Sequence, residues 1–248
     1  MRLSEAIDLF DGPLLRDIID STRGSDSTPQ ESNSTPQESN FTPQESDSTP
    51  QGSNSTPGAT ISTPRGTSST TPKGSPISNG APSPLRWADL GCGSGLFTEA
   101  LARFLPAGST IYGLDLRPML QSESVGGVRL VPVSTDFINI PLPVTGLNGI
   151  LMANSFHYVA DKPAFLSMLT RPQHPDHPES APLLPGSPLL FVEYDTDTPV
   201  STWVPWPVSL AKLRPLLAAA GWSKVLKLGE RPSAFGRSNI YAAVAKIK

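Results

Sequence analysis

The chain has 248 residues, of which 37% are hydrophobic and 7% aromatic, and its formal net charge is −3. Phosphate neutralisation usually leaves a basic stripe on a protein, so this charge argues against a nucleic-acid partner. The single cysteine excludes an internal disulfide, and no apolar run approaches the roughly 20 residues that cross a bilayer. The first residues lack the apolar core of a signal peptide, so we expect a cytoplasmic protein that does not engage a membrane.

The first 20 residues form a segment of their own. Apolar residues recur there at roughly helical spacing, and Gly12-Pro13 interrupts the pattern, which predicts two short amphipathic helices. Two interpretations remain open for them. The helices either pack on the core or form a lid over a substrate pocket.

Residues 21–84 carry a degenerate seven-residue repeat that begins as STPQESN. Proline recurs every seven residues from Pro29 to Pro64, and no position of the repeat is reliably apolar, which excludes a coiled coil. Such a segment cannot offset the entropy of ordering its backbone, so we expect a disordered linker. A Ser/Thr-Pro phosphorylation array or a partner-binding tail is the alternative.

From residue 85 onward, short apolar runs alternate with helical patterns, which is typical of a parallel sheet covered by helices on both faces. Ser209 and Gly221 are expected to cap the last helix, and Pro215 to kink or restart it. The expected strands are residues 85–90, 110–115, 128–133, 149–153, 189–193, 224–229 and 240–246, and the expected helices are 96–105, 162–169 and 209–220.

The most informative segment is Asp89-Leu90-Gly91-Cys92-Gly93-Ser94-Gly95, where a strand ends, a glycine-rich turn follows and a helix opens. Glycines at such a turn let the backbone bend sharply and approach a ligand closely. A dinucleotide fingerprint, GxGxxG, would need glycine where Leu96 stands. The spacing therefore argues against a nicotinamide cofactor.

This DxGxGxG pattern resembles motif I of the class I S-adenosylmethionine-dependent methyltransferases, of the type 11 or type 25 kind. Acidic residues after the next two strands, Asp115 and Asp136, fit the same family. The resemblance covers residues 85–248 and implies a Rossmann-like three-layer α/β sandwich. Its seven-stranded, mostly parallel sheet would have the order 3-2-1-4-5-7-6, with the last strand antiparallel.

The resemblance also implies S-adenosylmethionine as cofactor and assigns roles to matching positions. Asp89 and the glycines would form the methionine pocket, Asp115 would bind the ribose, and Asp136 with Phe137 the adenine. The sequence departs from the family pattern after residue 115, where the connection is so short that the next helix is expected to be short or absent. Leu116 or Met119 is then expected to cover the adenine. The full expected cofactor-binding set is Asp89, Gly91, Cys92, Gly93, Gly95, Asp115, Leu116, Asp136, Phe137 and Asn154.

The acceptor is expected at the same edge of the sheet, because the loops after parallel strands share that edge. The substrate-pocket candidates there are Tyr158, Tyr194, Trp203, Trp206 and Arg237. His157 is the leading candidate for a general base, with Glu193 as the other, although a structural histidine lining the pocket remains open. We expect Cys92 to be selected for its small size, and we expect no metal site.

Three hypotheses about function follow. The favoured one is an enzyme that methylates a small molecule, and the second is a methyltransferase acting on RNA or protein. The third is a protein that binds S-adenosylmethionine without catalysis, or a nicotinamide enzyme. The sequence identifies neither the acceptor nor the methylated atom, and it does not indicate an oligomeric state.

Overall fold

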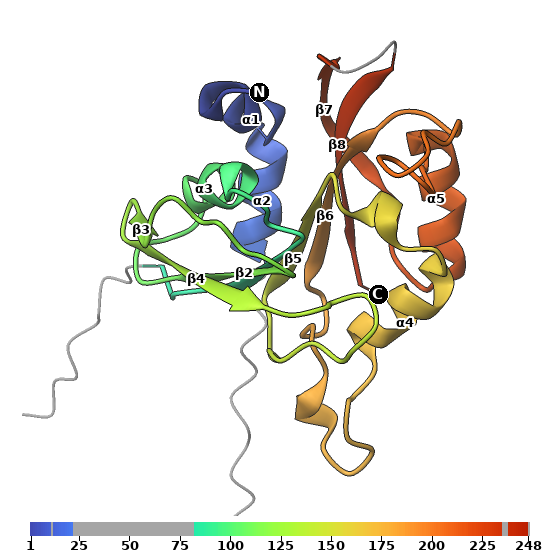
Figure 1. Ribbon diagram of the computed structural model, residues 1–248. Helices are drawn as coiled ribbons and strands as arrows, with labels where there is room; N and C mark the ends of the chain where they lie inside the picture. The colour runs from blue at the N-terminus through green and yellow to red at the C-terminus, as the bar shows by residue number, and fades with distance from the viewer. Residues whose placement is uncertain (11, 22–81, 235–237, 248) are drawn as a thin grey trace, which may run out of the picture. The chain divides into compact units, whose positions relative to one another are not determined.

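The computed structural model describes residues 1–10, 12–21, 82–234 and 238–247 (Figure 1). The predicted linker, residues 21–84, lies outside the described residues except at its two ends, and so does the candidate Arg237. The two N-terminal helices and the described part after residue 81 belong to one compact unit. No helix in these described ranges has the length and apolar composition needed to span a bilayer.

An eight-stranded sheet forms the centre of this unit, in the order β3-β4-β2-β1-β5-β6-β8-β7. The strands are β1 (Arg86–Leu90), β2 (Thr110–Asp115), β3 (Ser124–Val125), β4 (Val128–Ser134), β5 (Gly149–Ala153), β6 (Pro188–Tyr194), β7 (Leu226–Pro232) and β8 (Asn239–Lys246). Strands β4, β2, β1, β5 and β6 pair in parallel, and β8 is antiparallel to β6. The predicted strand order and the antiparallel last strand are therefore confirmed.

The predicted count of seven strands is wrong by one, because β3 adds a short edge strand. Gly126 and Gly127, with φ of 59° and 81°, form a tight turn that pairs β3 with β4 in antiparallel register. Positive φ at two successive residues is typical of a two-residue hairpin, which fits the right-handed twist of the strands it joins. The connection between β2 and β3 contains no helix, which agrees with the short or absent helix that the short sequence after residue 115 predicts.

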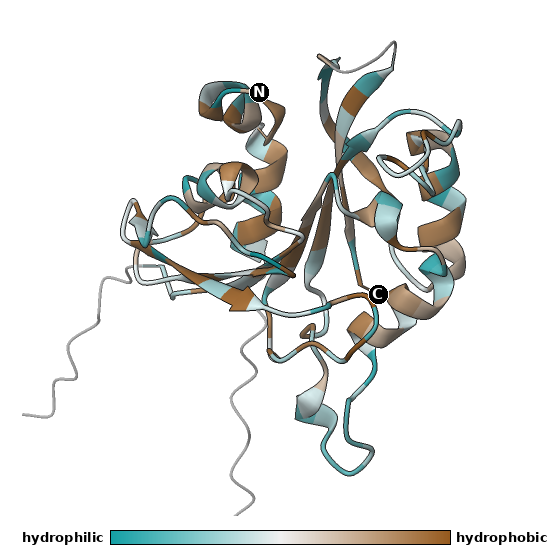
Figure 2. Ribbon diagram, in the orientation of Figure 1, coloured by the Kyte–Doolittle hydropathy of each residue, from teal (hydrophilic) through white to brown (hydrophobic). Residues whose placement is uncertain are grey.

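Helices cover both faces of the sheet, giving the predicted three layers. Helices α1 (Leu3–Phe10), α2 (Pro13–Ser21) and α3 (Leu96–Ala102) share one apolar core with the sheet. The other face packs against α4 (Lys162–Thr170) and α5 (Leu210–Ala219). Figure 2 shows the hydrophobic strands running between these layers.

Several element boundaries differ from expectation. Helix α3 ends at Ala102 and not near residue 105, while β7 begins two residues later than predicted and continues to Pro232. Ser209 caps α5 by accepting from the Lys212 amide, as predicted, and Gly221 follows the helix with φ of 86°. Pro215 lies inside α5, which is one continuous helix, so the predicted restart does not occur.

Candidate active site

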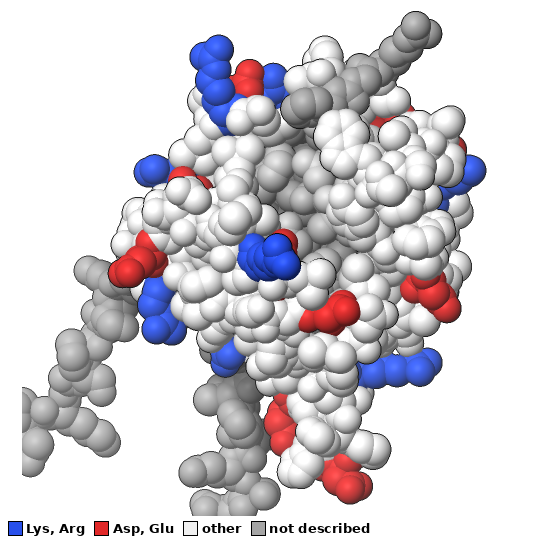
Figure 3. All heavy atoms as spheres, in the orientation of Figure 1, with Lys and Arg blue, Asp and Glu red and all other residues white. Residues whose placement is uncertain are grey.

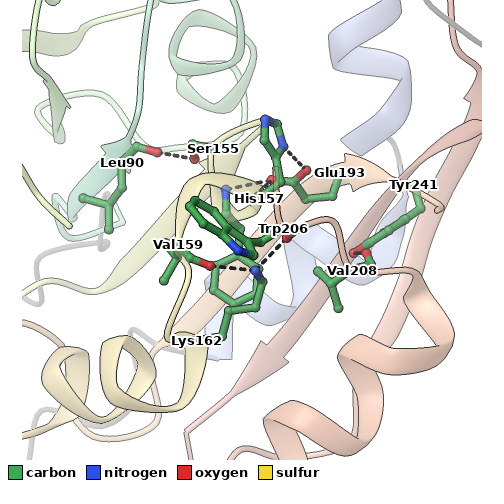
Figure 4. Close-up of polar contacts among 10 residues, drawn as sticks. Leu90, Ser155, His157, Val159, Lys162, Glu193, Trp206, Val208 and Tyr241 are labelled. Carbon is green, nitrogen blue, oxygen red and sulfur yellow. Dashed lines mark hydrogen bonds and ion pairs between the residues drawn. The ribbon is translucent and has the colours of Figure 1, made fainter. Parts of the chain in front are cut away.

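The glycine turn after β1 depends on backbone conformations that only glycine adopts easily. Gly91, Gly93 and Gly95 have φ of 84°, 51° and 86°. A Cβ atom on Gly91 would lie 2.4 Å from the Cβ of Ser155, so the loop after β5 packs directly onto the turn. Ser155 also donates its hydroxyl to the Leu90 carbonyl (Figure 4). The ends of two neighbouring strands are thereby fixed against each other.

Asp115, at the end of β2, holds the glycine turn from the other side. Its Oδ2 accepts from the Gly93 amide at 3.0 Å, and its Oδ1 from the Arg117 amide at 2.9 Å. A carboxylate has about four lone-pair sites, so each oxygen can accept one more hydrogen bond. The carboxylate is therefore held in a fixed orientation with capacity for two hydroxyl donors.

Asp89 lies beneath the turn as a buried carboxyl group. Its Oδ2 accepts from the Thr98 hydroxyl at 2.6 Å, whereas its Oδ1 is buried without a hydrogen-bond partner. Burial raises the pKa of Asp89 to about 7, and the charge of Asp115 adds to this increase. The side chain is enclosed, so any effect on a ligand passes through the turn above it.

A cavity of about 410 Å³ opens beside the glycine turn at the carboxyl edge of the sheet, and we call it the donor cavity. Its walls are Gly91, Asp115, Leu116, Asp136, Phe137, Ile138, Asn154, Ser155 and Tyr158. Six of these residues are in the cofactor-binding set expected from the sequence. The fold thus brings together residues from the ends of four parallel strands.

Asp136 and Phe137 form the part of the donor cavity beyond β4. Asp136 accepts from the Asn139 side chain at 2.8 Å and from the Ile138 amide at 3.2 Å. The Asn139 side-chain hydrogen bond contributes most to lowering the pKa of Asp136, which keeps the group ionised. The ring of Phe137 packs edge-on against Phe165 of α4, with 6.4 Å between the ring centroids. The cavity therefore has one apolar wall and one hydrogen-bond acceptor at this end.

Four residues of the expected cofactor set do not line the donor cavity: Asp89, Cys92, Gly93 and Gly95. The Cys92 side chain points toward β2, where a Cβ on Gly113 would lie 3.0 Å from Sγ. Burial raises the pKa of the Cys92 thiol to about 12, so it does not act as a nucleophile. Its small size suits the close packing against Gly113, as expected.

A second cavity of about 260 Å³, here called the acceptor-side cavity, lies under the N-terminal helix α1. Its walls are Met1, Glu5, Leu96, Phe97, Asn154, Tyr194, Arg231, Pro232, Ser233, Ala234 and Ile240. Arg231 binds Glu5 of α1 at 2.9 Å, which joins the helix to the end of β7. Asn154 belongs to the walls of both cavities. Helix α1 therefore packs on the core and also covers this cavity, whereas its role as a lid over a substrate pocket stays a prediction.

The aromatic candidates for the substrate pocket are not all brought together. Tyr158 lines the donor cavity and Tyr194 the acceptor-side cavity. Trp203 and Trp206 are each half exposed and line neither of these two cavities. The Trp206 amide donates to the His157 carbonyl of η2 (Phe156–Tyr158) at 3.0 Å. The structure therefore does not bring these two tryptophans together with Tyr158 and Tyr194 in one cavity.

His157 and Glu193 form a buried pair at the end of β6. The Nδ1 atom of His157 lies 2.7 Å from Oε2 of Glu193 (Figure 4). The other carboxylate oxygen, Oε1, accepts from the amides of Phe156 and His157 at 2.7 Å and 3.3 Å. The centroid of the His157 ring lies 4.4 Å from that of Tyr158 and 6.1 Å from that of Tyr194. Tyr158 lines the donor cavity and Tyr194 the acceptor-side cavity, whereas His157 and Glu193 line neither.

Lys162, which the sequence did not single out, holds the loop after β6 in place. Its ammonium donates to the carbonyls of Val159 and Trp206, both at 2.7 Å, and lies 5.0 Å from the centroid of the Phe156 ring (Figure 4). Burial lowers the pKa of Lys162 to about 8. The contact with Trp206 joins residues 44 positions apart, and no local pattern would have revealed it.

The face drawn in Figure 3 is hollowed at its upper centre, between α1 and the β7–β8 pair of Figure 1. On the described surface of this face, Lys and Arg are interspersed with Asp and Glu, and they form no basic stripe. A further hollow of about 430 Å³ lies at the opposite edge of the sheet, among α4, α5 and residues 178–185. It contains none of the expected site residues.

The family model of a methyltransferase domain matches residues 88–176, which include the glycine turn, Asp115, Asp136 and Asn154. Residues 88–176 of the chain therefore match a methyltransferase domain. The strand order and register described above agree with that family's fold.

The methyltransferase is also similar to solved structures, although no curated protein sequence matches it significantly. A methyltransferase from Aquifex aeolicus is 16% identical, with 66% of this chain and 82% of that chain covered and a TM-score of 0.45. One from Methanosarcina mazei is 16% identical over 66% and 92% of the two chains, with a TM-score of 0.44. Magnesium protoporphyrin IX methyltransferase from Synechocystis, solved with bound S-adenosylmethionine, is 18% identical over 65% and 70%, with a TM-score of 0.42.

Proposed function

We propose that the enzyme binds S-adenosylmethionine in the donor cavity and transfers its methyl group to a small molecule in the acceptor-side cavity. The observation that carries this proposal is the position of Asn154, which lines both cavities at the end of β5. A methyl group that passes between two bound molecules needs a contact point of this kind, because in-line displacement requires the reacting atoms about 3 to 3.5 Å apart.

The residues of the donor cavity fit the cofactor. Asp115 has capacity for both ribose hydroxyls, and Phe137 provides an apolar wall for the adenine, with Asp136 as its hydrogen-bond acceptor. Asn154 Oδ1 is buried without a hydrogen-bond partner, and such an orphaned acceptor fits a polar ligand group that completes it. The cofactor supplies a methyl group on a sulfonium, and the chain positions it and excludes water.

The dimensions of the acceptor-side cavity support a small molecule as the acceptor. A volume of about 260 Å³ under α1 suits a compact molecule better than a polymer. Its walls combine apolar side chains, such as Leu96 and Phe97, with the Glu5–Arg231 ion pair. Residues 1–20 would act as a lid, residues 85–248 as the catalytic domain, and residues 21–84 as a linker between them.

Calorimetric titration tests the donor half of the proposal. S-adenosylhomocysteine should bind with micromolar affinity and NADH should not, and Asp115→Ala should weaken binding roughly tenfold or more, about 1.4 kcal/mol or above. Glu230→Ala, which removes an exposed carboxylate on β7, should leave the affinity unchanged. A preference for NADH, or an unaffected Asp115→Ala variant, would contradict the proposal.

The acceptor half needs its own variant. Replacing Phe97 with tryptophan should fill the acceptor-side cavity and leave the donor cavity untouched, because Phe97 lines only the former. We expect S-adenosylhomocysteine affinity to be retained while methyl transfer, once an acceptor has been identified by screening, is lost. Full transfer in this variant would place the acceptor elsewhere.

A further inference from the structure

The acceptor-side cavity has one ion pair among its described walls. Arg231 of β7 and Glu5 of α1 carry opposite charges there, whereas the other described residues of the walls have apolar or uncharged side chains. The Nη2 atom of Arg231 lies 2.9 Å from Oε1 of Glu5, and the two side chains are 30% and 32% exposed. An ion pair that water reaches to this extent is a weak contact. A ligand that enters the cavity can therefore replace one of the two partners.

Arg231 has more unused hydrogen-bonding capacity than Glu5. A guanidinium has five N–H donors, and within the described residues only Glu5 Oε1 accepts from one of them. Glu5 is more fully occupied, since its Oε2 atom also accepts from the Arg2 amide at 2.7 Å. With Oε2 directed at that amide, Glu5 meets the guanidinium through one oxygen. The carboxylate of a ligand has no such constraint and can bind Arg231 through two parallel hydrogen bonds.

Arg231 lies on the face of β7 that α1 covers. A Cβ on Gly229 would lie 2.8 Å from the Leu9 carbonyl oxygen, so the backbone of α1 packs directly on this face. Residues two positions apart on a strand share a face, which places Arg231 beside α1 as well. Helix α1 therefore has a packing contact with β7 that does not depend on the Glu5–Arg231 pair.

The register of the sheet sets the distance between Arg231 and the donor side. Ile240 of β8 pairs with Arg231 on one side and with Tyr194 of β6 on the other. Asn154 follows β5, the next strand beyond β6. Three steps of about 4.8 Å separate the backbones of Arg231 and Asn154 by about 14 Å, and the two side chains shorten this gap. A small molecule with its carboxylate at Arg231 can therefore reach Asn154, where the two cavities meet.

We propose that Arg231 is the specificity-determining residue of the acceptor-side cavity and that it selects small molecules with a carboxylate group. Glu5 pairs with the guanidinium in the structure, and the carboxylate of the ligand takes its place. The use of the bound molecule as a methyl acceptor rests on the proposed function. Recognition of the carboxylate does not, because it depends on the cavity and on Arg231 alone.

Calorimetric titration with matched probes tests which charge the cavity selects. The probes are the straight-chain acids from butanoate to octanoate, the corresponding primary amides and the corresponding amines, each added to the full chain. At least one acid should bind about tenfold or more tightly than its amide, because the amide lacks the charge that pairs with Arg231. Equal affinities for every acid and its amide would overturn the proposal. A preference for the amines would also overturn it, because it would assign recognition to Glu5.

Two variants should change the affinity for that acid in opposite directions. Arg231→Gln should weaken binding by about tenfold or more, to the level of the amide. Glu5→Gln should strengthen binding by about two- to fivefold, because it removes the competing charge of an exposed ion pair. The control Lys227→Gln removes a cation that pairs with Glu230 on the same strand, and it should leave the affinity unchanged. Undiminished binding in Arg231→Gln, or binding in Glu5→Gln no stronger than in the parent, would contradict the proposal.

Titration of the same samples with S-adenosylhomocysteine keeps this proposal distinguishable from the proposed function. Neither Arg231 nor Glu5 lines the donor cavity, so the acid should bind equally well when S-adenosylhomocysteine is present. If acids bind at Arg231 but the parent does not bind S-adenosylhomocysteine, the proposed function fails while the carboxylate site stands. If S-adenosylhomocysteine binds but no acid is preferred over its amide, only the inference about Arg231 fails. Thermal unfolding shows whether each variant is folded, and if Arg231→Gln is not, the result for Glu5→Gln decides.

Discussion

Gly91→Ala tests how closely the loop after β5 packs on the glycine turn. Gly91 has φ of 84°, and an alanine there costs about 1–2 kcal/mol for its left-handed conformation. The new Cβ would also lie 2.4 Å from Ser155 Cβ, a contact that the backbone must relieve by moving. Overpacking of this kind costs about 1–3 kcal/mol, so we expect a total loss of about 2–5 kcal/mol.

Gly126→Ala is the matched control, because Gly126 has φ of 59° but open space where its Cβ would lie. It should cost only the conformational part, about 1–2 kcal/mol. Urea unfolding of both variants measures the free energies of unfolding and shows through the slope whether the unfolded states are comparable. Equal losses in the two variants would refute the claim that Ser155 packs onto the turn.

Two further predictions concern buried charges. Because burial raises the pKa of Asp89 to about 7, the folded protein retains a proton that the unfolded chain releases above its ordinary value near 3.8. The free energy of unfolding should therefore fall by up to about 4 kcal/mol as the pH rises from about 4 to 7. Urea titrations at several pH values measure this dependence, which the Asp89→Asn variant should lose. A variant whose pH profile runs parallel to that of the parent would contradict the assignment to Asp89. Lys162→Met leaves the carbonyls of Val159 and Trp206 without their donor and should cost about 2–4 kcal/mol of stability in thermal or urea unfolding. The control Lys212→Met removes only an exposed ion pair with Asp197 and should cost under about 1 kcal/mol. Similar losses in both lysine variants would refute the bridging role of Lys162.

The strand order and the donor cavity were predictable because their signals are local. A candidate site residue stands at or just after the end of each of three parallel strands, so the sequence alone places Asp115, Asp136 and Asn154 at one edge of the sheet. The glycine turn is recognisable by its spacing alone. Cys92 shows the limit of this reasoning, since its position in the motif says nothing about where its side chain points.

The acceptor side was less predictable because it depends on contacts between distant residues. Glu5 and Arg231 meet 226 residues apart, and only folding brings α1 over the end of β7. His157 and Glu193 were each recognised as candidates, yet their pairing across 36 residues was not. Trp203 and Trp206 come from an aromatic-rich loop whose sequence does not show which way its side chains turn, and both remain half exposed.

A crystal structure of the enzyme with S-adenosylhomocysteine tests the central claim most directly. The account predicts the ribose at Asp115, the adenine along Phe137, and the sulfur toward Asn154, where the two cavities meet. The ligand bound in the cavity under α1, or with its ribose away from Asp115, would contradict the assignment of donor and acceptor sides.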